Sequence, residues 1–261
     1  MSLNDSAAAA VNKKVTLLDK SFSRFAGRST LAGVYLTVGT AFAGVVGNAV
    51  EQLVPGLGTP VFAMLFGLGL FAIVVLGADL ATGNMMYMAY GAVNKQVSWG
   101  KGLWLLIVTT FFNLVGVILF AAAMGMSAKF SGMDPSHLIV TLSEGKLTKT
   151  PQGMFVEAIL ANFVVNMAIV GGIFAKEVVS KFFMIVPIIA CFVGLGLEHV
   201  IANFCLFLLT AFGSDPLPAA LTIGNVTLNW TLVWLGNLVG GGFLIGGVYA
   251  WLNNGPEEYR D

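Results

Sequence analysis

The chain has 261 residues, of which 57% are hydrophobic and only 10% are charged, and its formal net charge is zero. A soluble domain usually carries about 25% charged residues, so this composition excludes an ordinary soluble protein and indicates a chain embedded in a lipid bilayer. A chain without net charge also gives no electrostatic support to nucleic-acid binding, and we expect no nucleic-acid partner.

Long apolar runs fill most of the chain and predict an all-α membrane protein with six transmembrane helices. A helix needs about 20 consecutive apolar residues to cross a bilayer. The runs that meet this requirement are 30–50, 60–90, 103–128, 152–174, 182–212 and 226–252. We therefore expect three parts: a cytoplasmic N-terminal segment at 1–29, a six-span transport domain at 30–252 and a cytoplasmic tail at 253–261.

The segment from Val15 to Arg28, just before the first run, combines apolar and basic side chains. At helical spacing one face would carry Leu17, Leu18, Phe22 and Phe25, with Lys and Arg on the other face. This pattern predicts an amphipathic helix that lies on the inner leaflet of the membrane. An ordinary polar lead-in to the first span is the alternative.

The distribution of Lys and Arg predicts the orientation. Six spans place both chain ends on one side, and ten of the 13 basic residues fall there: Lys13, Lys14, Lys20, Arg24, Arg28, Lys95, Lys101, Lys176, Lys181 and Arg260. The other side has only Lys129, Lys146 and Lys149. Because cytoplasmic loops carry an excess of Lys and Arg, we expect a multi-pass protein of the cell (inner) membrane with both termini in the cytoplasm.

Polar and ionisable side chains interrupt the second and fifth runs, in the sequences GADLATGN at 77–84 and GLEHVIAN at 196–203. Such groups are costly at bilayer depth and usually face a cavity, a partner or a substrate path. Asp79 and Glu198 hold equivalent positions in the two sequences, and we interpret them, with Asn84 and Asn203, as the scaffold of two broken helices. A proton relay through the two carboxylates is the alternative.

His199 is the histidine inside an apolar run, and it is the first candidate for a transport site. An imidazole can hydrogen-bond an anion or pass a proton near neutral pH, whereas a structural histidine would be tied to a backbone carbonyl. Thr82 and Asn162 are the further candidates. Their alternative roles are to satisfy backbone groups at the break and to hydrogen-bond between helices.

The chain also repeats itself, because the sequence NLVG at 113–116 recurs at 237–240. Each copy lies one span after an interrupted run. An odd number of spans in each half inverts the second half relative to the first, and inverted repeats with broken helices are a recurrent transporter plan. The sequence therefore predicts two inverted three-helix repeats with broken second and fifth helices.

Taken together, these motifs resemble the formate/nitrite transporter family over about 28–251. The resemblance is carried by FGLGL at 66–70 followed by GADLAT at 77–82, ILAN at 159–162, EHVIAN at 198–203 and LGNLVGG at 235–241. It implies an aquaporin-like fold and a homopentamer with one pore in each protomer. It also implies proton-coupled or pH-gated passage of small monovalent acids or anions.

The resemblance further implies roles for single residues. The constriction candidates are Phe66, Leu70, Leu80 and Phe192, and the polar vestibule between them would hold Thr82, Asn162 and His199. Ala81 stands where relatives often have a bulky aromatic residue, so the inner constriction would be wide enough for lactate unless Met85 or Met86 fills the gap. Lys146 and Lys149 are the two candidates for a basic residue that attracts anions to the outer mouth.

The function that follows is channel-like transport of formate, with lactate or acetate as further cargo. Nitrite or hydrosulfide transport by the same architecture is the alternative. A water or glycerol pore is less favoured, because neither polar sequence contains the Asn-Pro-Ala motif of that class and no span contains Arg.

The sequence has no HExxH, GxSxG, P-loop or cysteine metal motif, so we expect no enzyme, no cofactor and no metal. We expect Cys191 and Cys205 to be small buried hydrophobic residues.

Overall fold

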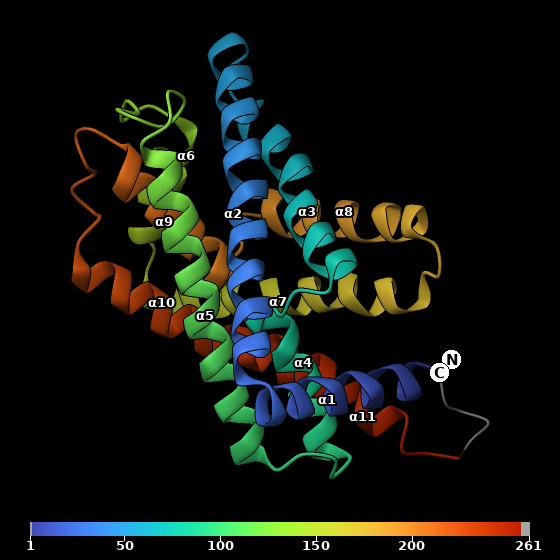
Figure 1. The fold of residues 1–261 in the computed structure, drawn as a ribbon. Coiled ribbons are helices and arrows are strands. Elements are labelled where there is room, and N and C mark those ends of the chain that lie inside the picture. The colour runs from blue at the N-terminus through green and yellow to red at the C-terminus, as the bar shows by residue number, and fades with distance from the viewer. Residues whose placement is uncertain (1, 257–261) are drawn as a thin grey trace.

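The computed structural model describes residues 2–256, which form helices joined by short connections (Figure 1). The long helices of the first half are α2 (Phe22–Leu53), α3 (Gly58–Leu76) and α5 (Trp99–Gly125), and α4 (Ala81–Val93) lies between the last two in sequence. The second half contains α7 (Pro151–Phe174), α8 (Val178–Gly194), α9 (Val200–Gly213) and α10 (Ile223–Asn237). The remaining elements are α1 (Leu3–Lys20), α6 (Leu138–Leu147), the π-helix η1 (Leu238–Gly247) and α11 (Val248–Leu252).

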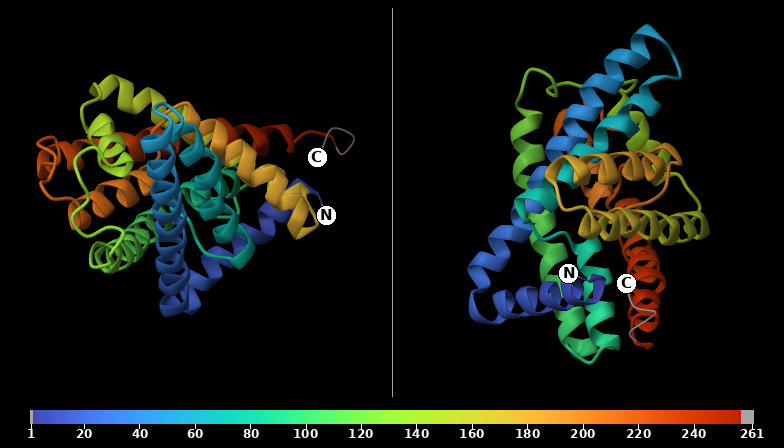
Figure 2. Two further views of the ribbon diagram at one scale, coloured as in Figure 1. Left: turned by 90° about the horizontal axis from the view of Figure 1, so that it is seen from above. Right: turned by 90° about the vertical axis from the view of Figure 1, so that its right-hand side faces the viewer.

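Helix α1 lies across one end of the bundle, and α11 ends nearby (Figures 1 and 2). The residues that α1 buries recur at helical spacing: Leu3, Ala7, Val11 and Leu18. At Ser21 the backbone leaves the helical region with φ −153° and ψ 68°, and α2 then starts at Phe22. The predicted single helix from Val15 to Arg28 is therefore wrong, because two helices meet at Ser21 and the second continues into the first span.

Five helices are long and apolar enough to cross a membrane, judged by length and composition: Phe22–Leu53, Gly58–Leu76, Trp99–Gly125, Pro151–Phe174 and Ile223–Leu252. The predicted run at 182–212 is instead divided between the shorter apolar helices α8 and α9. Of the predicted C-terminal tail, 257–261, including Arg260, lies outside the described residues.

In both polar sequences the backbone leaves the helical conformation. After α3, Gly77 adopts a left-handed conformation with φ +69°, and helix resumes at Ala81. After α8, Gly196 has φ +68°, and helix resumes at Val200. Since this conformation is strained for residues with a side chain, the two glycines explain why the chain turns at these positions.

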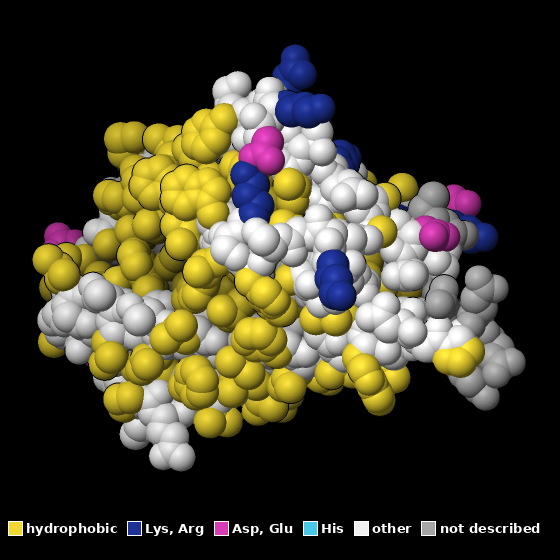
Figure 3. All heavy atoms as spheres, turned by 90° about the horizontal axis from the view of Figure 1, so that it is seen from below, with side chains coloured by type: hydrophobic (Ala, Val, Ile, Leu, Met, Phe, Trp, Pro, Cys, Tyr) yellow, Lys and Arg dark blue, Asp and Glu magenta, His cyan; other side chains and the backbone are white. Residues whose placement is uncertain are grey.

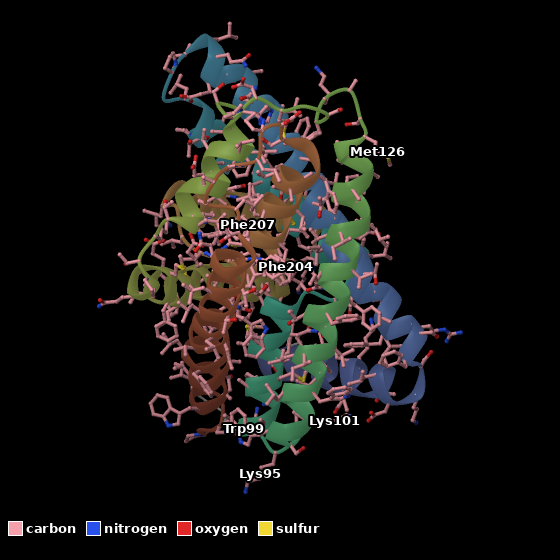
Figure 4. The ribbon with its side chains drawn as sticks, turned by 90° about the vertical axis from the view of Figure 1, so that its left-hand side faces the viewer. Lys95, Trp99, Lys101, Met126, Phe204 and Phe207 are labelled. Carbon is pink, nitrogen blue, oxygen red and sulfur yellow. The ribbon has the colours of Figure 1, made fainter. Side chains whose placement is uncertain are left out.

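Each half packs around its own long helix. Helix α2 contacts α3 and α5, whereas α7 contacts α8 and α10, so the two halves have similar internal contacts. Figure 4 shows α5 from Lys101 near its lower end to Met126 at its upper end, with Phe204 and Phe207 of α9 beside it. The second half thus reaches across to the first through α9 and α5.

The outer surface is largely apolar. Seen from below, hydrophobic side chains cover most of the left and lower parts of the view, whereas Lys and Arg are scattered at the top, near the middle and at the right (Figure 3). Met126 is 82% exposed, and large apolar side chains such as Phe111 and Phe183 point outward as well. Cys205 is buried as predicted, whereas the prediction is wrong for Cys191, which lies exposed on α8.

Candidate functional site

His199 and Thr82 meet at the centre of the molecule, where the two resumed helices α4 and α9 begin. Nε2 of His199 lies 2.8 Å from the Thr82 hydroxyl oxygen, and both residues are buried. Nδ1 of His199 accepts a hydrogen bond from the backbone N–H of Ala202 at 3.1 Å and so caps α9. Because Nδ1 accepts, a neutral imidazole carries its proton on Nε2 and donates it to Thr82.

Apolar side chains flank this polar pair. The Phe192 ring lies 5.8 Å from the His199 ring, and Phe66 lies 5.9 Å from Phe192 in an edge-to-face contact. Leu70 and Leu80 line a cavity at the α1 end of the molecule. Phe66 and Phe192 do not line this cavity. The predicted constriction residues are thus divided between two places, with His199 in contact with the aromatic group.

Asn162 lies close to Thr82 but turns its amide toward backbone. Its Nδ2 donates to the Thr82 carbonyl at 3.2 Å and to the Asn237 carbonyl at 2.8 Å, and it also contacts Met85 Sδ. Asn166, one turn later, donates to the same Thr82 carbonyl at 3.3 Å. This geometry favours the interhelical role of Asn162 over an anion contact, because carbonyls of the protein already accept the hydrogen bonds of its amide.

Two asparagines of the repeated NLVG sequence brace the two breaks. Asn113 donates to the carbonyl of Asp79 at 2.8 Å and accepts from the N–H of Ala81 at 2.9 Å. Asn237 donates to the carbonyl of Glu198 at 2.9 Å and accepts from the N–H of Val200 at 2.9 Å. Each also donates to a helix of its own half, at the carbonyls of Ser29 and Ala158 respectively. Unpaired backbone groups at both breaks are thereby satisfied.

The Glu198 carboxylate is buried and fully engaged. Its Oε1 accepts from Lys146 and from Lys149, both at 2.8 Å, so the structure brings both candidate lysines to this carboxylate. Its Oε2 accepts from Asn203 at 2.6 Å and from Asn229 at 3.3 Å. Asn229 was not predicted as a site residue, although it lies two turns before Asn237 on the same face of α10. Four donors around one carboxylate compensate its burial.

The two lysines differ in their environment, although both lie in the segment between α5 and α7, outside the membrane-crossing helices. Burial opposes the charged form of each ammonium group. At Lys146 burial prevails over the attraction of Glu198, and its pKa is lowered. At Lys149 the carboxylates of Glu198 and Glu157 prevail over burial, and its pKa is raised.

Asp79 is paired from outside the bundle, by Lys14 of α1. This pair could not be predicted from the sequence, because nothing in the spacing places α1 over the first break. Asn84 lies on the next turn of α4, buried, where its Nδ2 donates to the Thr109 hydroxyl at 3.2 Å. Asp79 and Asn84 therefore hold the first break against α1 and α5.

A cavity of about 260 Å³ opens at the α1 end, next to the first break. Its charged lining residues are Lys13, Lys14, Arg28, Asp79 and Lys181. Ala81 is fully buried and does not line this cavity, so the predicted effect of its small side chain on the width of the path has no support in this arrangement. Met85 and Met86 are also buried and lie beside it in α4.

Comparisons with known proteins agree with this arrangement. A family model described as formate/nitrite transporter matches residues 2–251. The "Uncharacterized transporter YwcJ" of Bacillus subtilis is 30% identical over 246 residues, which is 94% of each chain. The formate channel FocA of Escherichia coli is 30% identical over 84% of this chain and 82% of its own. The nitrite transporter NirC of Escherichia coli is 28% identical over 84% of this chain and 79% of its own.

Solved structures give the same result for the fold. A structure titled "FNT family ion channel" superposes with a TM-score of 0.88 and 27% identity, over 97% of this chain and 98% of the other. A pentameric formate channel with formate bound has a TM-score of 0.72 over 90% of this chain and 98% of the other. At 23% identity, this second likeness concerns the fold alone.

Proposed function

Because the chain belongs to the formate/nitrite transporter family, we propose that it carries a small monovalent anion or its acid across a membrane past His199 and Thr82. The family consists of transporters and channels, and the apolar helices make the chain a multi-pass membrane protein. The observation that carries the proposal is the 2.8 Å contact between His199 and Thr82, a buried polar pair beside aromatic side chains.

The architecture that we propose has six spans in two inverted halves. Helices α3 and α4 form the broken second span, and α8 and α9 form the broken fifth span. The matching hydrogen bonds of Asn113 and Asn237 support this pairing of the halves. A transport domain over 30–252 follows, with 1–29 and 253–261 outside it.

The chemistry of the path favours a neutral acid at its narrow points. An ion loses its water at an apolar constriction, whereas a protonated acid crosses at lower cost. The neutral His199 imidazole, which donates through Nε2, offers a hydrogen bond to an arriving anion once Thr82 releases it. Lys146 and Lys149 increase the local concentration of anions near Glu198. This sequence of events couples anion passage to a proton, supplied by His199 or by bulk water.

We further propose a homopentamer in the cell (inner) membrane, with the end that carries α1 in the cytoplasm. The pentameric assembly of the formate channel with the same fold supports the first part. The excess of Lys and Arg at the α1 end supports the second. Phe66, Leu70, Leu80 and Phe192 remain the proposed constrictions, and Asp79, Asn84, Glu198 and Asn203 the proposed scaffold.

The substrate that we favour is formate, because the formate channel FocA is 30% identical to this chain. Nitrite is the second candidate, supported by the 28% identity to NirC. Lactate, acetate and hydrosulfide share the single charge and are further candidates.

The test is uptake of labelled formate, nitrite and lactate into liposomes that contain the purified protein. Each anion is tested with and without an imposed pH gradient, and empty liposomes give the background. Formate uptake that rises when the outside is acidic is the expected result. Uptake that is independent of the gradient would contradict proton coupling, and uptake of nitrite alone would reverse the order of the substrates.

A further inference from the structure

One face of α4 forms a wall of the cavity at the α1 end. Leu80, Gly83, Asn84 and Tyr87 all line the cavity. Their spacing of three and four residues places them on one side of a helix. A Cβ atom at Gly83 would come within 2.8 Å of Ile169 Cδ1 on the opposite wall. A side chain at position 83 would therefore collide with Ile169 of α7, so the glycine allows α4 to pack closely against α7 beside the cavity.

Tyr87 has a polar group that the proposed path does not use. Within residues 2–256 its hydroxyl makes no hydrogen bond, although the side chain is half-buried. The ammonium group of Lys14 lies 5.2 Å from the centre of the Tyr87 ring. A phenylalanine would form the same apolar wall, so the packing of α4 gives no reason for the hydroxyl.

The cavity around this pair has an excess of positive charge. Lys13, Lys14, Arg28 and Lys181 line it, and Asp79 is the carboxylate among the described lining residues. A cluster of like charges in a partly enclosed space attracts ions of the opposite sign. The volume of about 260 Å³ exceeds the roughly 30 Å³ that one water molecule occupies in the liquid. The space therefore accommodates a small anion together with several waters.

We propose that the Tyr87 hydroxyl and the Lys14 ammonium form an anion-binding subsite in this cavity, which holds the cargo anion before it passes Leu80. The inference rests on the proposed function, and its ligand is a small monovalent oxyanion such as a carboxylate. Tyr87 donates its O–H to the anion, and Lys14 supplies the opposite charge. Without an anion, Asp79 is the partner of Lys14, so the arriving anion competes with this carboxylate.

The experiment compares Tyr87→Phe with the wild type, and Tyr35→Phe serves as the matched control. Tyr35 of α2 is also a half-buried tyrosine, but it packs against the main hydrophobic core and does not line the cavity. Initial rates of formate uptake are measured against formate concentration in right-side-out and inverted membrane vesicles. Loss of one hydrogen bond to a charged ligand is expected to raise the half-saturating concentration about tenfold at the face that carries α1.

A second readout does not depend on transport. Formate should raise the melting temperature of the detergent-purified wild type and of Tyr35→Phe, and raise it less in Tyr87→Phe. An unchanged half-saturating concentration in Tyr87→Phe, or an equal change at both faces, would overturn the subsite. A wild type that moves neither formate nor nitrite would instead overturn the proposed function, and the subsite is then decided by the formate-dependent melting temperatures alone.

Discussion

Asn113 and Asn237 make the same three hydrogen bonds at equivalent places in the two halves of the molecule. Each amide donates to the carbonyl of the acidic residue in its break, and each side-chain oxygen accepts from an N–H where the helix resumes. The third bond of each reaches the long helix of its own half. The repeated sequence therefore has a structural purpose, because one amide replaces the backbone bonds that a broken helix lacks.

This equivalence predicts that Asn113→Ala and Asn237→Ala destabilise the protein to a similar degree. Each substitution leaves two buried backbone groups at its break without their side-chain partner, and we expect a loss of at least about 2 kcal/mol. The measurement is the thermal unfolding of the purified variants, followed by intrinsic fluorescence. Asn254→Ala, at an exposed position, is the control. Strongly unequal losses at the two sites would argue against their structural equivalence.

Gly116 and Gly240, which end the two copies of the NLVG sequence, lie so close to a neighbouring helix that a side chain at either position should disturb the packing. A Cβ atom at Gly116 would lie 2.0 Å from the Thr30 carbonyl oxygen, and one at Gly240 would lie 2.0 Å from that of Ile159. Backbone cannot yield cheaply, so Gly116→Ala should separate α5 from α2 and lower the yield of folded protein. Gly100→Ala, in the same helix, has no atom within 4 Å of its Cβ and should fold normally. Equal yields of the two variants would show that the helices are not closely packed.

The contacts of Glu198 with Lys146 and Lys149 predict that substitutions of the two lysines lower the stability of the protein in a non-additive way. Lys146→Met or Lys149→Met alone leaves the carboxylate one ammonium partner, whereas the double variant leaves it none. An uncompensated buried charge costs about 3–5 kcal/mol, so the double variant should lose more than the sum of the single ones. Thermal unfolding of the four proteins measures the coupling. Glu198→Gln should restore part of the stability of the double variant, and a failure to do so would contradict this account.

The sequence was sufficient to predict those elements of the fold that have a strong local pattern. The apolar runs, the two polar interruptions and the repeated NLVG sequence all correspond to features of the structure, and the family is confirmed. The family resemblance grouped His199 with Thr82, and the structure places their side chains 2.8 Å apart. These features depend on local composition, which a single sequence displays directly.

Contacts between distant segments were not predictable in the same way. Nothing in the spacing of Lys14 indicates that α1 would turn at Ser21 and reach Asp79. For Asn162 the sequence left an anion contact and an interhelical hydrogen bond as alternatives, because the carbonyls that its amide contacts belong to other helices. Tyr87 was overlooked since a tyrosine near the end of an apolar run is ordinary, and its position in the cavity depends on the fold.

Ala81 illustrates how a buried position changes a prediction. The side chain is fully buried, and its N–H is held by Asn113. A phenyl ring at this position has no cavity to enter, so Ala81→Phe should reduce formate and lactate uptake together and lower the yield of folded protein. Paired uptake of the two acids by Ala81→Phe and the wild type at one pH is the measurement. A selective loss of lactate would restore Ala81 as a size filter.

His199 has two functions that different substitutions separate. Nδ1 caps α9, and Nε2 contacts Thr82. His199→Phe removes both, so it should stop acid-dependent formate uptake and also cost about 1 kcal/mol of stability through the lost cap. His199→Asn keeps a side-chain oxygen for the cap, because Asn is a favoured residue at this helix position, but it cannot exchange a proton near neutral pH.

The prediction is therefore that His199→Asn melts close to the wild type and loses the dependence of formate uptake on the pH gradient. Thr82→Val is the companion variant, since it removes the hydroxyl partner of Nε2 and leaves the imidazole in place. Uptake by Thr82→Val should remain sensitive to pH but fall in rate. If His199→Asn is stable and its uptake still rises with an acidic outside, the imidazole does not carry the proton, and the acid must take it directly from bulk water.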